Sequence, residues 1–140
     1  MTEADAASTY EQRARAIQLA SQPLLESFEH WLKHAGWSEQ TVQGHLDNIR
    51  FFTNYLAWYT RSQYSLDEAT DSDVYWFLAD WFPRKALWAS VASVRAYLAS
   101  FKKFFTWMGV TGLVAPHIVA DVLDTLKFER DEFLRKVAEE

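Results

Sequence analysis

The chain of 140 residues is long enough for one domain with a buried core, without covalent or metal staples. Apolar residues make up 49% and charged residues 24%, and the absence of cysteine excludes disulfide scaffolds, thiolate zinc sites and cysteine nucleophiles. The formal net charge of −5 argues against a general polyanion binder. The longest apolar run, residues 74–79, is far shorter than the roughly 20 residues of a membrane span. With no basic apolar leader, the sequence predicts a cytoplasmic protein that does not contact a membrane.

Only four Gly and three Pro residues are available for turns, which favours long helices over many short strands. Residues 1–20 are rich in helix formers but poor in apolar residues, and they predict a peripheral helix or a tail. Pro23 suits the first turn of a new helix, over residues 23–35. We therefore expect the folded domain to comprise residues 21–140.

The next two helices have clear start signals. Apolar residues recur at intervals of three and four over residues 39–60, which predicts a long helix with Ser38 as its N-cap. Thr70 and Asp73 have the spacing of a capping box, and they predict a short helix over residues 71–82 that Pro83 stops.

Residues 89–108 give the strongest helical pattern. Their apolar stripe consists of Val91, Val94, Leu98, Phe101, Phe105 and Met108. The opposite stripe is small and polar, and suits close approach by a packed helix or a phosphodiester backbone: Ala92, Ser93, Ala96, Ala99, Ser100 and Lys103. A last helix is predicted over residues 116–138. Since no strand pattern or repeat occurs, the predicted fold class is all-α, a compact orthogonal bundle of four main helices plus a C-terminal helix.

Charge is spread unevenly along the chain. Residues 1–70 contain five Lys or Arg against nine Asp or Glu, whereas residues 71–140 contain nine against ten. No acidic residue occurs between Asp80 and Asp121, a window that holds five cations: Arg84, Lys85, Arg95, Lys102 and Lys103. This window is either an ordinary solvated basic face or a local anion-binding surface.

No catalytic constellation is found in the sequence, which has neither a Gly-rich phosphate loop nor a GxSxG elbow. His30 and His34 have a zinc-binding spacing on one helix, but no third ligand is suggested by spacing. Asp71 and Asp73 lie in the first turn of a helix, where the helix dipole explains them. We therefore predict that the protein is not an enzyme, with no catalytic residue, metal site, cofactor or small-molecule substrate.

The order and spacing of these helical motifs resemble the core-binding domain of tyrosine recombinases, the phage-integrase SAM-like N-terminal domain. The segment FEHWLKHAGWSEQTVQGHLDNIRFFTNYL resembles that family's Gly-x-Ser turn and following pattern at Gly36, Ser38, Thr41, Leu46, Ile49 and Phe52, with His45 in place of the family's usual Tyr. TDSDVYWFLADWF resembles the family's third helix, and SVASVRAYLASFKKFFTWMGVTGLV resembles its fourth. The resemblance covers residues 22–128, approximately.

The resemblance implies a domain that lies across duplex DNA with its second and fourth helices over the backbone. The family's separate catalytic domain carries a His-x-x-Arg and a Tyr nucleophile, whereas this chain has no His-x-x-Arg and no Tyr after Tyr97. A free-standing, non-catalytic domain is thus expected, with a fragment of a longer recombinase as the alternative. The DNA contacts implied by the resemblance and by the basic window are Thr41, Gln43, Arg50, Arg84, Lys85, Ser90, Ser93, Arg95, Lys102 and Lys103.

Two functions remain open at this point. The first is a non-catalytic DNA-binding domain with modest, salt-dependent affinity for duplex DNA. The second is a protein-interaction or self-association module that has kept the fold and lost DNA binding. The acidic balance, the small-residue stripe and Asp47 on the second helix favour this alternative, because a carboxylate repels phosphate.

Overall fold

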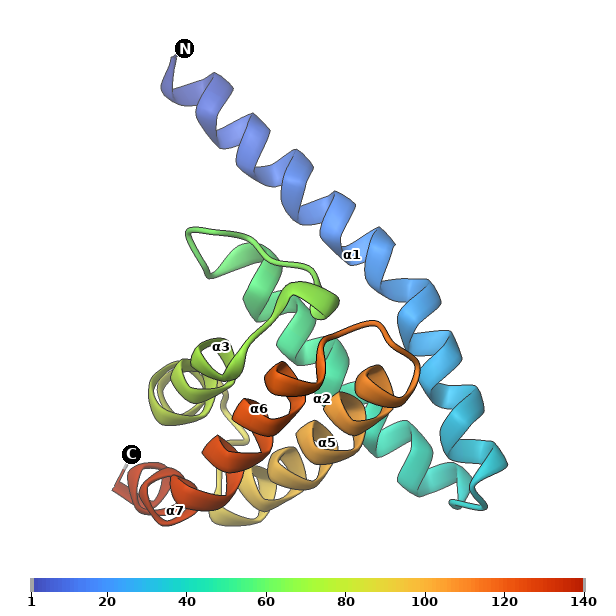
Figure 1. Ribbon diagram of the computed structural model, residues 1–140. Coiled ribbons are helices and arrows are strands. Elements are labelled where there is room, and N and C mark those ends of the chain that lie inside the picture. Colours follow the sequence, from blue (N-terminus) through green and yellow to red (C-terminus); the bar gives the residue numbers. More distant parts are fainter. Residues whose placement is uncertain (1, 140) are drawn as a thin grey trace. The chain divides into compact units, whose positions relative to one another are not determined.

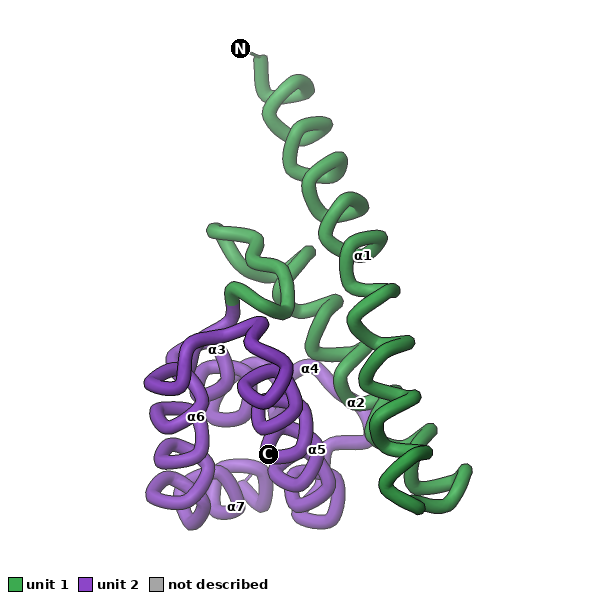
Figure 2. The backbone as a smooth tube through the Cα atoms, turned by 45° about the vertical axis from the view of Figure 1, so that its right-hand side comes forward, with its two compact units in different colours: residues 1–68 green, residues 69–140 purple. Residues whose placement is uncertain are grey.

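Helices account for all the regular structure of residues 2–139, which are the residues that the computed structural model describes (Figure 1). In chain order they are α1 (Glu3–His34), α2 (Glu39–Trp58), η1 (Leu66–Glu68), α3 (Asp71–Trp76), η2 (Phe77–Trp81), α4 (Phe82–Lys85), α5 (Val91–Val110), α6 (Pro116–Phe128) and α7 (Arg130–Glu139). The described residues contain no strand, so the predicted all-α class is confirmed. The chain forms two compact units, residues 1–68 and 69–140 (Figure 2).

The helix that was expected to begin at Pro23 is instead the second half of α1, which runs unbroken through the proline (Figure 1). Buried residues recur at intervals of three and four on both sides of Pro23: Ala14, Ile17, Ser21, Leu25, Phe28 and Leu32. This continuous stripe lies on a helix that packs against α2 over a long stretch. Burial of one face therefore outweighs the local helix-breaking tendency of proline.

Replacing Pro23 tests how much the proline lowers the stability of the protein. We expect Pro23→Ala to stabilise the protein by about 1–3 kcal/mol, because alanine restores a helical N–H and removes the ring clash with the preceding turn. Pro23 is exposed, so no buried contact is lost. Urea unfolding measures the change, with the exposed neighbour Gln22→Ala as a control that should change stability by at most a few tenths of a kcal/mol. Unchanged or lower stability in Pro23→Ala would contradict this account.

A buried glutamine links α1 to the end of α2 in the first unit by hydrogen bonds. Gln63 lies in the left-handed region at φ 52°, and its side-chain amide donates to the carbonyls of Tyr10 and Ala57 at 2.8 and 3.1 Å. The Tyr10 hydroxyl donates to the carbonyl of Thr60 at 2.6 Å. The carbonyl of Ala57, in the last turn of α2, and that of Thr60, just beyond this helix, thus each receive a side-chain donor.

The second unit has an aromatic core around α5. The Phe77 ring centroid lies 5.2 Å from that of Tyr97 and 5.8 Å from that of Phe101. The predicted α5 stripe is confirmed from Val94 to Met108, whereas Val91 is only half-buried. Tyr97 and Phe104, which the predicted stripe omitted, are buried as well.

The helix predicted over residues 71–82 consists of three segments in direct succession, α3, η2 and α4, and it ends at Lys85 rather than at Pro83. Pro83 is the second residue of α4, directly after the π-helical segment, so the proline does not stop this continuous helical run. The π-helical segment η2 buries all its residues except Asp80, more than one apolar face of a regular helix does. The last predicted helix is divided as well, because Glu129 separates α6 from α7.

The cap of α3 gives a pH-dependent prediction. The backbone N–H of Thr70 donates to the Asp73 carboxylate at 2.9 Å, yet burial raises the pKa of that carboxyl. A raised pKa in the folded state favours folding at low pH, and this contribution is lost as the pH rises through the folded pKa. The stability of the wild type relative to Asp73→Asn should therefore increase as the pH is lowered from 7 towards 4, as measured by urea unfolding.

The stability of the wild type relative to Asp80→Asn should instead decrease as the pH is lowered. The Arg84 guanidinium donates to both carboxylate oxygens of Asp80, at 3.1 and 2.9 Å, and this hydrogen bond lowers the pKa of Asp80. The stabilising contribution of the pair is therefore lost as the pH falls. The same pH trend in both variants would contradict these assignments.

Candidate functional site

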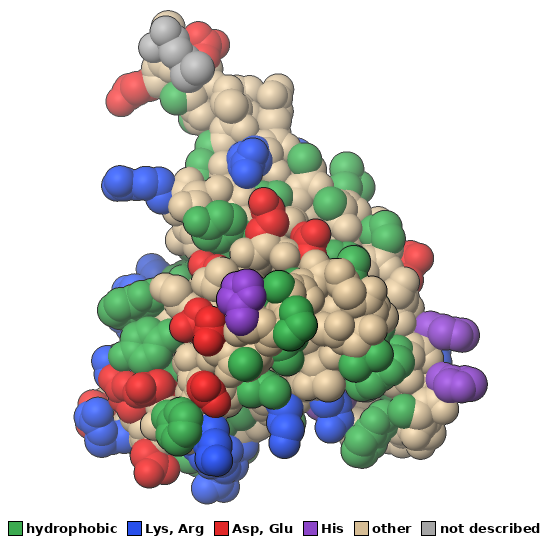
Figure 3. All heavy atoms as spheres, in the orientation of Figure 1, with side chains coloured by type: hydrophobic (Ala, Val, Ile, Leu, Met, Phe, Trp, Pro, Cys, Tyr) green, Lys and Arg blue, Asp and Glu red, His purple; other side chains and the backbone are tan. Residues whose placement is uncertain are grey.

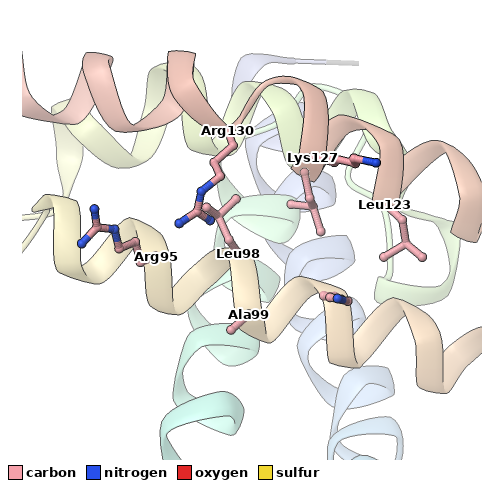
Figure 4. A pocket seen from close by; sticks show the side chains of 8 residues that line it. Arg95, Leu98, Ala99, Leu123, Lys127 and Arg130 are labelled. Carbon is pink, nitrogen blue, oxygen red and sulfur yellow. The ribbon is translucent and has the colours of Figure 1, made fainter.

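A groove of about 500 Å³ lies in the second unit, between α5 and the consecutive helices α6 and α7 (Figure 4). Apolar side chains form its floor: Leu98, Ala99, Leu123 and Leu126. Cationic side chains line it as well: Arg95 and Lys102 from α5, Lys127 from α6 and Arg130 from α7. We call these eight residues the cationic groove.

Helical periodicity explains how two short stretches of sequence build the cationic groove. On α5, Arg95 and Lys102 are seven residues apart, about 10.5 Å along the axis, and Leu98 and Ala99 fall between them on the same side. On the opposite wall, Leu123 and Leu126 precede Lys127 and Arg130 at helical spacing. Each side of the groove therefore supplies two apolar residues to the floor and two cations to the wall.

None of the four cations forms an ion pair with an Asp or Glu among residues 2–139. The acids at the α6–α7 junction have other partners. A hydrogen bond that the protonated Glu129 carboxyl donates to the Glu132 carboxylate raises the pKa of Glu129 and lowers that of Glu132. Glu132 also accepts a hydrogen bond from the Tyr75 hydroxyl at 3.0 Å. The cationic groove thus presents positive charge that no carboxylate of residues 2–139 neutralises by direct contact.

Two of the DNA contacts predicted from the sequence, Arg95 and Lys102, line the cationic groove. Lys103 does not line it and is half-buried. Ser90 and Ser93 form the cap of α5, in which each backbone N–H donates to the other's hydroxyl, at 2.8 and 3.1 Å. These serines have a structural role in helix capping.

The two predicted contacts on α4 differ in their surroundings. Arg84 is held by the Asp80 carboxylate, as described above. Lys85 is exposed in the last turn of α4 and does not line the cationic groove. Of this pair, Lys85 is the better donor for an external anion, because it is not held by a carboxylate among the described residues.

The remaining predicted contacts lie on α2, in the first unit: Thr41, Gln43 and Arg50. The Gln43 amide donates to the carboxylates of Glu29 and Glu39, at 3.2 and 3.3 Å. Arg50 pairs with Asp47 at 3.3 Å. Since carboxylates adjoin both side chains, this part of α2 is a poorer site for a phosphate than the cationic groove.

Lys127 and Arg130 line the cationic groove but were not among the contacts predicted from the sequence. Both lie beyond Asp121, outside the acid-free window, in a stretch where acidic and basic residues alternate. A search for cations at helical spacing from apolar residues would have found them, since Lys127 follows Leu123 by four positions and Arg130 follows Leu126 by four.

Lys and Arg side chains lie along the lower edge of the face drawn in Figure 3, with Asp and Glu side chains among them on one side. His30 and His34 are exposed, with ring centroids 6.4 Å apart. Over residues 2–139, no group of three or more His, Asp or Glu is placed to hold a metal ion.

None of the described helices combines the length and the apolar character needed to cross a membrane.

Comparison with protein-family models, with curated proteins and with solved structures finds no match to this chain. The resemblance to the core-binding domain of tyrosine recombinases therefore stays a prediction from the sequence.

Proposed function

We propose that this chain binds duplex DNA without cleaving it, through phosphate contacts made by the cations of the cationic groove. One observation carries the proposal: four cations line a single groove, and none of them is ion-paired among the described residues. A phosphodiester backbone is a ligand that can neutralise several separated positive charges at once. The resemblance to DNA-binding core-binding domains supports the same partner.

The four cations suit different kinds of phosphate contact. The guanidinium groups of Arg95 and Arg130 can each donate two hydrogen bonds to one phosphate, whereas the ammonium groups of Lys102 and Lys127 act as point charges. Phosphate contacts position a protein on DNA but do not read sequence. We therefore expect weak discrimination between duplexes, with affinity limited by the small number of contacts and by the net charge of −5.

A salt titration of the full chain tests this function. Two fluorescein-labelled duplexes of unrelated sequence, each about 25 bp long, are titrated at ~50 and ~200 mM salt with anisotropy as the readout. We expect similar affinity for both duplexes and a slope of log K against log salt of roughly −3 to −4, because each of four contacts contributes about 0.9. Absence of binding at ~50 mM salt, or binding that salt does not weaken, would overturn the proposal.

The apolar floor favours a second candidate function, the docking of a protein. Leu98 and Leu126 are buried, Leu123 is half-buried and Ala99 is exposed, so the floor still presents apolar surface to solvent. A DNA backbone has little apolar surface to cover it, whereas a protein partner can bury it.

A further inference from the structure

We propose that the cationic groove is a docking site for an acidic amphipathic helix of a partner protein. The groove has both an apolar floor and cations on its two walls. A single small anion would contact the cations but not the floor, whereas an amphipathic helix can contact both. It does not rest on DNA binding, although it uses the same surface.

The floor of the cationic groove suits the apolar face of a helix. The floor combines Leu98 and Ala99 from α5 with Leu123 and Leu126 from α6, in a groove whose volume of about 500 Å³ can receive several apolar side chains. Ala99 is small and exposed, so a helix can approach the α5 backbone closely at this point. A helix that projects apolar residues at i, i+3, i+4 and i+7 presents one continuous apolar stripe to such a floor.

The walls of the cationic groove add charge complementarity. Arg95 and Lys102 lie on the α5 side of the floor and Lys127 and Arg130 on the other side, and the Arg130 side chain extends from the α6–α7 junction towards α5 (Figure 4). A helix with its apolar stripe on the floor has a flank facing each wall. Glu or Asp on both flanks would therefore meet cations that no described carboxylate contacts.

Other occupants use the groove less completely. A duplex backbone neutralises the cations but leaves the floor uncovered. An acyl chain with one anionic head covers the floor but has too little charge for cations on both walls. A basic or neutral helix leaves the cations without partners. The acidic amphipathic helix is the occupant that matches both features.

The test uses a labelled synthetic peptide and the full chain. The probe has Leu at the i, i+3, i+4 and i+7 positions and Glu at the flanking positions. A scrambled peptide of the same composition and a peptide with Lys in place of Glu are the controls, and anisotropy at ~150 mM salt is the readout. We expect the amphipathic acidic peptide to bind at least about tenfold more tightly than either control.

Variants test separately how the floor and the cations of the walls contribute to peptide binding. Leu123→Gln removes apolar character from the floor, and we expect it to weaken peptide binding about fivefold or more while duplex binding stays within about twofold. Ala99→Trp fills the floor at an exposed position, so it supplies a second test if Leu123→Gln does not fold. The double variant Lys102→Glu/Arg130→Glu should weaken peptide binding at least tenfold, approximately. Circular dichroism melts verify the fold of each variant.

The outcomes distinguish this inference from the proposed function. Peptide binding that requires the amphipathic order and the floor supports helix docking, whatever the DNA titration shows. Equal binding of the scrambled peptide, or unchanged peptide binding in both floor variants, would reduce the interaction to charge attraction and overturn the inference. Duplex binding without any peptide binding would also overturn it and would leave the proposed function standing. If both ligands bind, unlabelled peptide should displace the duplex.

Discussion

Phe101→Ala should destabilise the protein by roughly 3–5 kcal/mol. The Phe101 side chain is fully buried, and its ring centroid lies 5.8 Å from Phe77, 5.8 Å from Tyr97 and 6.4 Å from Phe105. Truncation loses the burial of the ring and leaves a cavity among aromatic side chains on α5 and η2. These side chains are themselves packed on further neighbours, so the core can close the cavity only in part.

Urea unfolding followed by tryptophan fluorescence measures this change, with Leu87→Ala as the matched control. Leu87 is fully exposed in the second unit, so its truncation should change stability by at most about 0.5 kcal/mol. If Phe101→Ala does not fold, Phe101→Leu retains part of the buried volume and should show a smaller loss in the same direction. A loss near zero for Phe101→Ala would mean that the ring is not part of the core.

The sequence predicted α5 well because its helical signal and its burial coincide. Its apolar residues recur on one face, and Ser90 and Ser93 mark its start by local capping chemistry. The stripe omitted Tyr97 and Phe104 because packing on several helices buries more of α5 than one face. Spacing within one helix cannot show how many neighbours surround it.

The misassignment at Pro23 has a different physical cause. Proline is a strong local breaker, and the residues before it are polar enough to suggest a tail. The stripe that continues through the proline, including Ile17 and Leu25, becomes meaningful only once α2 lies beside it. Tertiary burial therefore decided a helix boundary that local propensity assigned otherwise.

The same distinction applies to the cationic groove. The acid-free window pointed to Arg95 and Lys102 because like charges were concentrated in sequence. Lys127 and Arg130 come from a stretch with interspersed acids, and only the packing of α6 and α7 against α5 places them at the same groove. Which carboxylates engage which cations is likewise set by geometry, as the pairing of Arg84 with Asp80 illustrates.

Reversing two charges of the cationic groove should weaken duplex binding by one to two orders of magnitude at ~100 mM salt. In Lys102→Glu/Arg130→Glu, one wall loses a point charge and the other a guanidinium group, and each gains a carboxylate that repels phosphate. Both side chains are exposed, so the fold should survive. The salt slope should become shallower by about two units, since each lost contact removes roughly 0.9.

The matched control is Arg61→Glu/Arg135→Glu, which changes the net charge by the same amount at exposed residues that do not line the cationic groove. If binding depended only on overall charge, the two double variants would weaken it equally. If the cationic groove holds the backbone, the control should retain most of the affinity and nearly the whole salt slope, because its phosphate contacts are intact. The salt slope measures how many phosphate contacts a protein makes, so the loss of true contacts must make it shallower. Equal losses of affinity in the two double variants, or an unchanged salt slope in Lys102→Glu/Arg130→Glu, would therefore show that the cationic groove does not contact the DNA.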